Sequence, residues 1–238
     1  MSLTGPDGLT ARADAIAASS AKRAFDVVFA AVGLVLSSPL WVLCAVAVKT
    51  DGGPVFFRQD RSGIGGRAFD ALKFRSMVPD AERLGALQAV PADPRVTWVG
   101  RWLRAAALDE LPQLVNILRG DMSVVGPRAL RPGEIEALGS GRFEVLEDIP
   151  GFALRARVRP GLTGLAQVYA ARNLPRRQKF RYDRLYVKRQ SFGLDLRLVA
   201  LSFWISLSGA WERRGRSSSR AHVPKTPLAN TRPHATSS

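Results

Sequence analysis

The chain has very little of the chemistry on which most catalytic and metal sites depend. Its 238 residues include one cysteine, Cys44, and two histidines, His222 and His234, both near the C-terminus. A single cysteine excludes a disulfide within the chain and fits a reducing compartment. A core without histidine excludes a Ser-His-Asp triad or a Cys-His pair and disfavours a histidine-based zinc site. Any acid, base or nucleophile must therefore come from carboxylates, hydroxyls, lysines or Cys44.

Acidic residues are also scarce. The chain has 20 Asp and Glu against 35 Lys and Arg, a net charge of +15 and a sequence pI of about 11.3. This balance indicates an anionic partner, such as nucleic acid, a phosphorylated small molecule or an anionic membrane surface. A hydrophobic content of 46% excludes a wholly disordered chain, and the length suits one domain with small appendages.

The longest uncharged run extends from Val27 to Val48. Its 22 residues would form a straight helix roughly 33 Å long, enough to cross a bilayer core of about 30 Å. The run begins too late and is too long for a cleaved signal peptide. We therefore expect a membrane helix over residues 21–50, with a buried core helix as the alternative.

Two features of this helix favour a re-entrant path. Ser37-Ser38-Pro39 falls in its middle, and Pro39 removes a helical hydrogen bond and kinks the chain. Both flanks are basic, and cationic flanks prefer the cytoplasmic side. A helix that bends at Ser38 and Pro39 and returns to the same face satisfies both facts. A kinked but ordinary span is the alternative.

Residues 54–77 have the pattern of two strands around a Gly-rich turn, Gly63 to Gly66. The turn lacks the spacing of a dinucleotide fingerprint, so its expected role is only to reverse the chain. Lys73 and Arg75 are two residues apart and would share one face of the second strand. They form a candidate phosphate-binding pair, with an ordinary solvated strand face as the alternative.

Downstream, the apolar spacing predicts a helix that contains Leu111, Leu114, Val115 and Leu118 and ends at Gly120. Arg155, Arg157 and Arg159 alternate as on one face of a strand. The other expected elements are helical segments within 79–107, a Gly-rich loop over 120–128 ending in Arg128, a helix over about 175–189 with Asp183 and Tyr186, and a helix over 198–211 with Trp204 and Trp211. The last, 14 uncharged residues, is too short to span a membrane and suits its interface, with a core helix as the alternative.

Asp109 and Glu110 form the most unusual feature of this basic chain, because they stand side by side where a helix is expected to begin. The simplest reading is that Asp109 caps the helix. However, a helix start is also a ready phosphate site, and a carboxylate can act as a nucleophile toward phosphorus. Mg²⁺ would relieve the repulsion between the two acids, since it binds one or two carboxylates together with substrate phosphates. The spacing does not say which acid would attack and which would hold the metal.

At this point the sequence resembles a known family. The segments "LDELPQLVNILRGDMSVVGPR" (108–128), "KFRSM" (73–77), "RPGLTGLAQV" (159–168) and the upstream "KRAFDVVFA…SSPL" are similar to those of the bacterial sugar transferases, which are monotopic phosphoglycosyl transferases. The resemblance covers roughly residues 20–212. It implies the short form of the family, without a multi-span N-terminal region.

The resemblance implies an α+β fold: a small mixed catalytic domain with an N-terminal re-entrant membrane helix kinked at Ser38 and Pro39 and with interfacial amphipathic helices. The expected regions are a flexible arm (1–20), the re-entrant helix (21–50), a cytosolic catalytic domain (51–195), an interfacial C-terminal helix (196–211) and a disordered basic tail (212–238). The implied location is the inner membrane of a bacterium, with the catalytic domain on the cytoplasmic face.

The implied reaction moves a sugar 1-phosphate from a UDP-sugar to polyprenyl phosphate, usually undecaprenyl phosphate, releases UMP and initiates exopolysaccharide or glycoconjugate synthesis. The family's motif makes Asp109 the nucleophile, through a covalent phosphosugar-aspartyl intermediate, and Glu110 the Mg²⁺ ligand. The other family positions implied to bind the substrate or its phosphates are Lys73, Arg75, Arg128, Arg159, Asp183 and Tyr186. Relatives often read Pro-Arg-Pro where this chain has Pro127-Arg128-Ala129, which puts the rigidity of that loop in question.

Two other classes of protein fit the charge. One is a membrane-bound nucleic-acid-binding protein, but the aromatic residues are not interleaved with the basic ones as stacking platforms. The other is a polybasic membrane scaffold without catalysis, whose charge should cluster beside its anchor. Here the charge is spread through segments with strand and helix periodicity, so we expect an enzyme and no nucleic-acid partner. The sequence leaves the sugar, the pathway, the oligomeric state and the role of the tail open.

Overall fold

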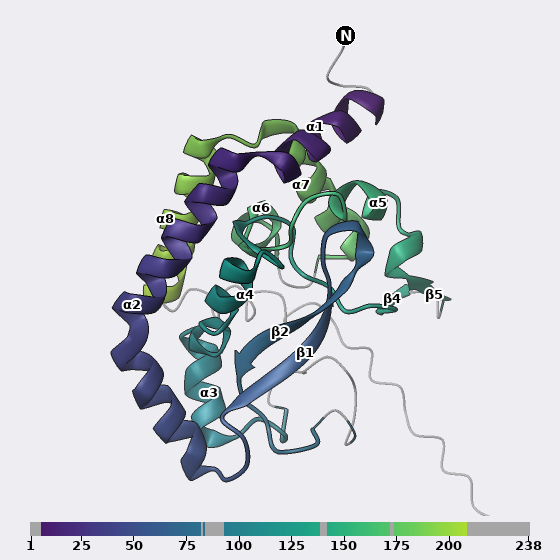
Figure 1. Ribbon diagram of the computed structural model, residues 1–238. Coiled ribbons are helices and arrows are strands. Elements are labelled where there is room, and N and C mark those ends of the chain that lie inside the picture. The colour runs from purple at the N-terminus through teal and green to yellow at the C-terminus, as the bar shows by residue number, and fades with distance from the viewer. Residues whose placement is uncertain (1–5, 82, 84–92, 139–141, 172–173, 209–238) are drawn as a thin grey trace, which may run out of the picture.

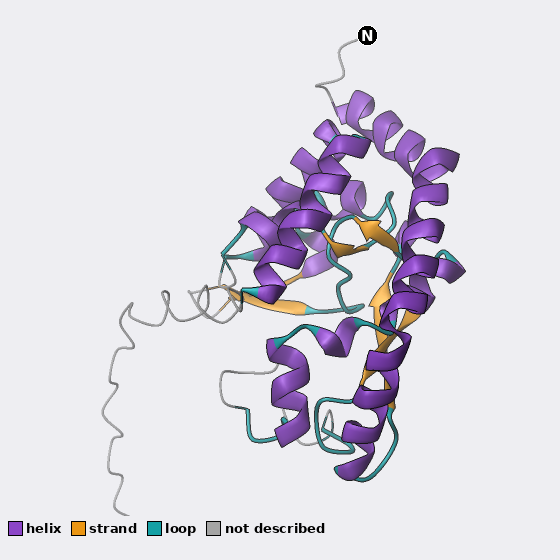
Figure 2. Ribbon diagram, turned by 90° about the vertical axis from the view of Figure 1, so that its left-hand side faces the viewer, coloured by secondary structure: helices purple, strands orange, loops and turns teal. Residues whose placement is uncertain are grey.

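The computed structural model describes residues 6–81, 83, 93–138, 142–171 and 174–208. Within these ranges it mixes helices with short strands, as the sequence predicted (Figure 1). Three two-stranded sheets are present in this part of the chain. The pairs β1 (Phe56–Ser62) with β2 (Ala68–Phe74) and β4 (Ile135–Leu138) with β5 (Arg142–Val145) are antiparallel, and β3 (Ser123–Val125) pairs in parallel with β6 (Gly161–Thr163). Seen from the side of the helix α2 (Ser20–Thr50), helices lie in front and the short strands lie behind them (Figure 2). The basic tail and Trp211 fall outside the described residues.

The first helix, α1 (Pro6–Ala18), corrects the expectation of a flexible arm over residues 1–20. Its Leu9, Ala13 and Ile16 are buried. Ala13 and Ile16 pack against Val158 and Val187. Arg12 donates to the carbonyls of Val187 and Gln190, each at 2.8 Å. The small residues that suggested a loose segment instead allow the helix to lie close against α7 (Arg176–Arg189).

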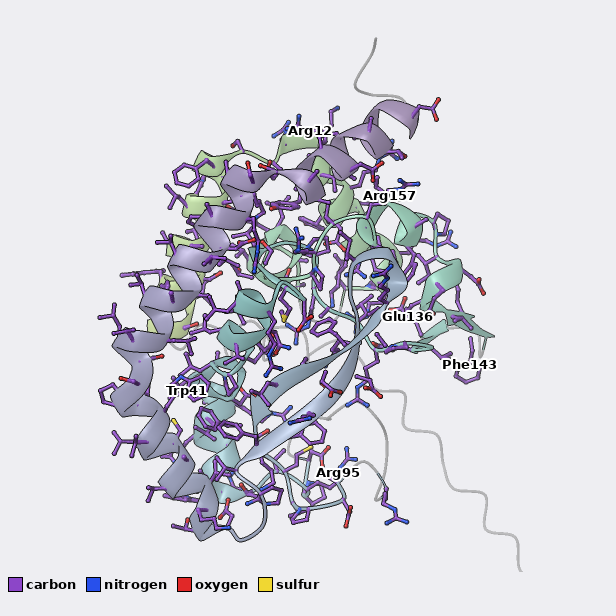
Figure 3. All side chains as sticks on the ribbon, viewed as in Figure 1. Arg12, Trp41, Arg95, Glu136, Phe143 and Arg157 are labelled. Carbon is purple, nitrogen blue, oxygen red and sulfur yellow. The ribbon has the colours of Figure 1, made fainter. Side chains whose placement is uncertain are left out.

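The helix α2 (Ser20–Thr50) contains the predicted apolar run. It is the one helix in the described ranges that is long and apolar enough to cross a membrane. Ala30 and Cys44 on one side are buried in the protein, whereas Val28, Val35, Leu36, Leu43 and Val46 on the other side are more than half exposed. Trp41 points from the inner side toward the hairpin (Figure 3) and packs edge-on against Phe74. The exposed apolar side is the surface that a lipid environment would cover.

Pro39 lies within α2, and the axis of the helix changes direction near its middle (Figure 1). Because Pro39 has no N–H, it leaves the carbonyl of Val35, four residues earlier, without its helical donor. The Ser38 hydroxyl donates to that carbonyl at 2.8 Å. Ser37 likewise donates to the Gly33 carbonyl at 2.6 Å. The Ser-Ser-Pro sequence therefore bends the helix while the Ser38 hydroxyl satisfies the carbonyl that Pro39 frees.

The strands β1 (Phe56–Ser62) and β2 (Ala68–Phe74) form the predicted hairpin around the Gly-rich turn, where Gly65 and Gly66 adopt positive φ. The expected pairing of Lys73 and Arg75 on one strand face is wrong, because β2 ends at Phe74. Arg75 turns away and is only 6% exposed. It donates to the carbonyls of Pro54, Val48 and Gly52, which fastens the C-terminal end of α2 to the hairpin.

A further correction concerns the segments 120–128 and 155–159. The middle of the expected loop is a short buried strand, β3 (Ser123–Val125), which pairs in parallel with β6 (Gly161–Thr163). The expected basic strand does not form: Arg155 ends the helix α5 (Phe152–Arg155), and a turn leads on to β6. The alternating arginines bind three separate places, the Arg128 carbonyl, Asp14 and the Ala17 carbonyl.

The remaining described elements frame the domain. The helix α7 (Arg176–Arg189) is present where expected, whereas the described helical part of 79–107 is confined to α3 (Trp98–Ala105) and short turns. The helix α8 (Phe192–Leu207) begins beside α2, with Phe25 and Phe192 in edge-on contact. It exposes Phe203 and Trp204, and α3 exposes Trp98 and Trp102. The other elements are α4 (Gln113–Arg119), β4 (Ile135–Leu138), β5 (Arg142–Val145) and α6 (Leu165–Tyr169).

Candidate active site

Asp109 and Glu110 lie in a single 3₁₀ turn, Leu108–Glu110, just before α4. The residue at the N-cap position of α4 is Pro112, so the structure does not use Asp109 as the cap of this helix. Ala107, directly before the turn, has φ 55°, a left-handed conformation that costs a non-glycine residue energy. The backbone is thus held in an uncommon shape immediately before the carboxylate pair.

The turn is fastened on two sides. Leu108 and Leu111 pack against the cluster that contains Cys44 and Val48 of α2. On the other side, Asn116 of α4 holds the backbone of β2: its amide donates to the Asp70 carbonyl at 2.7 Å and accepts from the Leu72 N–H at 2.9 Å. Asp109 and Glu110 are therefore placed between the apolar helix α2 and the end of the β1–β2 hairpin.

Glu110 gathers cations from two other elements. The Lys73 ammonium group at the end of β2 lies 3.2 Å from Oε1 of Glu110, and the Arg128 guanidinium lies 3.5 Å from the same oxygen. Lys73 and Glu110 are mostly buried, whereas the Arg128 side chain is 47% exposed. The three side chains line a pocket together with Arg61, Gln113 and backbone near Gly161.

The electrostatics distinguish the two acids. Burial and the adjacent Glu110 charge raise the pKa of Asp109 to about 6, against the opposing effect of Lys73, Arg104 and Arg128. Burial also acts to raise the pKa of Glu110, but Lys73 and Arg128 outweigh it and hold that pKa at about 2. Two neighbouring carboxylates with pKa values moved apart are typical of sites in which each has its own role.

Arg61 belongs to this pocket and was missed in the sequence reasoning. It donates to the Ala129 carbonyl at 2.9 Å and to Gln59. Burial and the nearby Arg128 and Arg131 lower its pKa to about 10, so it stays charged at neutral pH. Strand pairing could have revealed it, because Arg61 pairs with Phe69 and thus shares the sheet face of Ala71 and Lys73.

Arg159, Asp183 and Tyr186 are placed elsewhere, and none lines the pocket beside Glu110. Arg159 donates to the carbonyls of Gly120 and Ala17. Asp183 is buried and pairs with Arg155 at 2.9 Å. Arg75, described above, binds the end of α2 and also lies outside the cluster. Of the predicted substrate-binding residues, the structure therefore brings Lys73 and Arg128 to Glu110.

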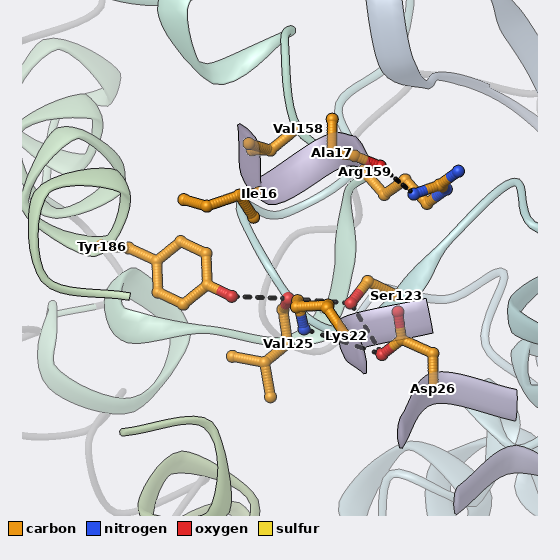
Figure 4. Close-up of a pocket in the computed structure, with 9 residues that line it drawn as sticks. All are labelled: Ile16, Ala17, Lys22, Asp26, Ser123, Val125, Val158, Arg159 and Tyr186. Atoms are coloured by element: carbon orange, nitrogen blue, oxygen red, sulfur yellow. Dashed lines mark hydrogen bonds and ion pairs between the residues drawn. The ribbon is translucent and has the colours of Figure 1, made fainter. Parts of the chain in front are cut away.

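Tyr186 and Arg159 line a second small pocket, between the end of α1, the start of α2, β3 and α7 (Figure 4). The Tyr186 hydroxyl is 3.0 Å from both the Val125 carbonyl and Asp195. Lys22 forms an ion pair with Asp195 at 3.0 Å and lies 3.6 Å from Asp26. This buried network ties the start of α2 to α7 and α8, which is a structural role.

The candidate site offers few acidic ligands for a metal ion. Within the described ranges, no group of three or more His, Cys, Asp and Glu is close enough to hold one. This donor set is too small for an all-protein cage but fits Mg²⁺, which is bound through one or two carboxylates plus substrate phosphates and waters.

A carboxylate pair among lysine and arginine side chains, attached to a helix with an exposed apolar side, is typical of an enzyme that handles phosphorylated substrates beside a membrane. Comparison with known proteins agrees with this class. The family model described as "Bacterial sugar transferase" matches residues 17–209. The chain belongs to the bacterial sugar transferase family, as the motifs around Asp109 indicated.

Three relatives illustrate the similarity. The chain is 43% identical over 190 residues to the UDP-glucose:undecaprenyl-phosphate glucose-1-phosphate transferase of Caulobacter vibrioides, covering 77% of this chain and 68% of the relative. It is 43% identical over 195 residues to the exopolysaccharide production protein ExoY of Rhizobium meliloti, covering 75% and 82%. It is 42% identical over 190 residues to the undecaprenyl-phosphate glucose phosphotransferase of Komagataeibacter xylinus, covering 76% of this chain but only 35% of that protein.

Proposed function

We propose that the chain transfers a sugar 1-phosphate from a UDP-sugar to a polyprenyl phosphate such as undecaprenyl phosphate, with release of UMP, as the first step of exopolysaccharide or glycoconjugate synthesis. The observation that carries the proposal is the cluster of Lys73, Arg128 and Glu110 beside Asp109. The names of two relatives, both of which include undecaprenyl phosphate, support the proposed class of lipid substrate.

In the first half of the proposed reaction, the diphosphate of the UDP-sugar binds beside Lys73, Arg128 and Arg61. These cations offset the negative charge that would otherwise repel a carboxylate. Asp109 attacks the phosphorus that bears the sugar, the bond from that phosphorus to the bridging oxygen breaks, and UMP leaves. With its pKa raised to about 6, Asp109 is ionised at neutral pH and remains more basic than an ordinary aspartate.

In the second half, an oxygen of polyprenyl phosphate attacks the same phosphorus. The acyl-phosphate bond to Asp109 breaks, the lipid-linked diphosphosugar leaves and the carboxylate is regenerated. Two displacements at one site predict ping-pong kinetics. Mg²⁺ held by Glu110 together with the substrate phosphates would add positive charge near the UMP that leaves in the first half-reaction.

The second substrate is a lipid, and the architecture supports its delivery from a membrane. The turn that carries Asp109 packs through Leu108 and Leu111 against α2, whose other side is apolar and exposed. We therefore propose that α2, the Trp-bearing α3 and α8 hold the site at the inner membrane of a bacterium, with the catalytic domain on the cytoplasmic face.

The contacts of α2 also support the re-entrant path. Lys22 near its start binds Asp195 of α8, and Val48 near its end accepts from Arg75 after the hairpin. Both ends of the helix thus contact one folded domain. A straight span would place these two sets of contacts on opposite sides of a bilayer, whereas a helix bent at Ser38 and Pro39 keeps them on one side.

Release of UMP from UDP-sugars tests the proposal. The purified protein in detergent should release UMP when both a UDP-sugar and undecaprenyl phosphate are present with Mg²⁺, and a panel of radiolabelled UDP-sugars would identify the sugar through the labelled lipid product. A polybasic scaffold or a nucleic-acid-binding protein releases none. Absence of UMP and of labelled lipid across the panel would overturn the proposed activity.

A further inference from the structure

Three consecutive residues after β3 have their carbonyl groups held by three different elements. The Pro127 carbonyl accepts from the Gly161 N–H at 2.8 Å, and the Ala129 carbonyl accepts from Arg61 at 2.9 Å. Between them, the Arg128 carbonyl accepts from Arg155. Since the Arg128 side chain itself is 47% exposed, these backbone bonds are what set the place from which it reaches Glu110.

Arg155, which donates to the Arg128 carbonyl, is itself held by a carboxylate and two aromatic rings. It is 6% exposed, and its Nε donates to Oδ2 of Asp183 at 2.9 Å. Its guanidinium lies 4.9 Å from the centre of the Phe180 ring and 5.9 Å from that of Phe152. Phe180 and Asp183 are three residues apart on α7 and therefore present ring and carboxylate from one helix face. Burying the Arg155 charge is costly unless it is paired, and here Asp183 and the two rings hold the guanidinium in place. Its other hydrogen bond goes to the Arg128 carbonyl.

We propose that Arg155, oriented by Asp183, is a positioning residue that fixes the backbone of Arg128 and so aims the Arg128 side chain at Glu110 and the substrate diphosphate. The proposal rests on the proposed function for its effect on rate, while its structural part stands without it. It also gives Asp183 a role that differs from substrate binding.

The first test compares Arg155→Lys with wild type. A lysine keeps a positive charge beside Asp183, but a single ammonium group does not reproduce the planar fork that bonds Asp183 and Arg128 together. We expect kcat/KM for UMP release to fall about 100-fold, as for other small misplacements of a catalytic group. The matched control is Arg157→Met, two residues along the chain from Arg155. This change removes an exposed arginine that pairs with Asp14, and it should leave kcat/KM unchanged.

A double-mutant cycle tests whether Arg155 acts through Arg128. If it does, Arg155→Lys/Arg128→Met should be no slower than Arg128→Met alone, within about twofold. Effects that multiply would show that Arg155 acts independently and would overturn the proposal. Should Arg155→Lys fold poorly, Arg155→Met/Asp183→Asn replaces it, because this pair leaves no unpaired buried carboxylate.

A measurement without turnover separates this proposal from the proposed function. Hydrogen exchange of the wild type, Arg155→Lys and Arg157→Met, each in detergent, reports on the peptide that covers residues 126–130. We expect faster exchange in Arg155→Lys only. Unchanged exchange would overturn the positioning role even in an active enzyme, whereas faster exchange in a protein that releases no UMP would leave the anchoring intact and overturn only the reaction.

Discussion

The ammonium group of Lys73 lies 3.2 Å from Oε1 of Glu110 and so joins the end of the hairpin to the turn that carries the carboxylate pair. This contact helps to hold Glu110 in its ionised form, while burial and the neighbouring charge raise the pKa of Asp109 to about 6. The two adjacent acids are thereby made unequal, which the spacing alone could not establish. The division favours Glu110 as the permanent anion and Asp109 as the more basic group.

Replacing Lys73 tests this contact. In Lys73→Met, Glu110 keeps Arg128 but loses its nearer cation, and the diphosphate loses a charge partner. We expect kcat/KM for the UDP-sugar to fall about 100-fold, since a lost charge-assisted hydrogen bond is worth roughly 3 kcal/mol. The control is Arg58→Met on β1, an exposed arginine 3.9 Å from Asp70. Equal rates for Lys73→Met and Arg58→Met would remove Lys73 from the site.

The pH dependence follows from the raised pKa of Asp109. As the pH falls through about 6, Asp109 takes up a proton and loses the charge that its proposed role as nucleophile requires, so kcat/KM should fall tenfold for each further pH unit. Measured at low Mg²⁺, the acid limb should have its midpoint near pH 6. In Lys73→Met the midpoint should move to higher pH, because a cation that favours the ionised form of Asp109 is gone. A midpoint at pH 4 or below in the wild type contradicts the environment described for Asp109.

The proposed covalent step is tested with Asp109→Asn, which keeps the shape of the side chain and removes the oxyanion proposed to attack. Turnover should fall more than about 1,000-fold, as for other nucleophile replacements. Without polyprenyl phosphate, the wild type should release one UMP per active site and gain the mass of a phosphosugar, and the variant should do neither. Asp70→Asn, at an exposed acid on β2, is the control. Activity of Asp109→Asn within tenfold of wild type would exclude the nucleophile role.

The proposed metal ligand is tested with Glu110→Gln. The amide keeps the size of the side chain but is a poorer ligand for a hard cation. We expect a large loss of kcat and a rise of at least tenfold in the Mg²⁺ concentration that gives half-maximal rate. Titration of UMP release with Mg²⁺ measures both quantities. If the variant loses rate but responds to Mg²⁺ as the wild type does, Glu110 does not hold the metal.

Another prediction concerns the close approach of the paired strands β3 and β6. A Cβ atom on Gly161 would lie 2.0 Å from the Gly126 nitrogen, a distance that no small shift relieves. Gly161→Ala should therefore lower the free energy of unfolding by about 3 kcal/mol or prevent folding. At Gly193, in the first turn of α8, nothing lies within 4 Å, so Gly193→Ala should be neutral or slightly stabilising. Thermal unfolding in the same detergent compares the two, and equal melting temperatures would show that β3 and β6 do not approach so closely.

The sequence predicted the elements whose signal is local. The apolar run of α2, the Gly-rich hairpin, the helix α4 and the basic helix α7 all follow from spacing and turn residues. The strands β3 and β6 could not be predicted in the same way, because each has three residues and they meet only through a parallel crossover. The spacing of Arg155, Arg157 and Arg159 is typical of a strand, yet each of these arginines bonds to a partner far away in the sequence.

The structure brings only some of the residues named from the sequence together. Asp109, Glu110, Lys73 and Arg128 were named from the sequence, and the structure gathers Lys73, Arg128 and Glu110. Arg75 and Arg159 were named for the same positive charge, but their guanidinium groups bind backbone carbonyls. A carbonyl partner leaves no trace in a sequence, so a structural arginine and a phosphate-binding arginine look alike until the fold is known.

The exposed apolar side of α2 has a kinetic consequence. A protein held by such a surface would not search a volume for the proposed lipid acceptor but would share a plane with it. The encounter rate then depends on how many acceptor molecules occupy each unit of membrane area. Diluting the acceptor with inert lipid should therefore slow the second half-reaction at constant bulk concentration, while the first, with a water-soluble donor, keeps its rate.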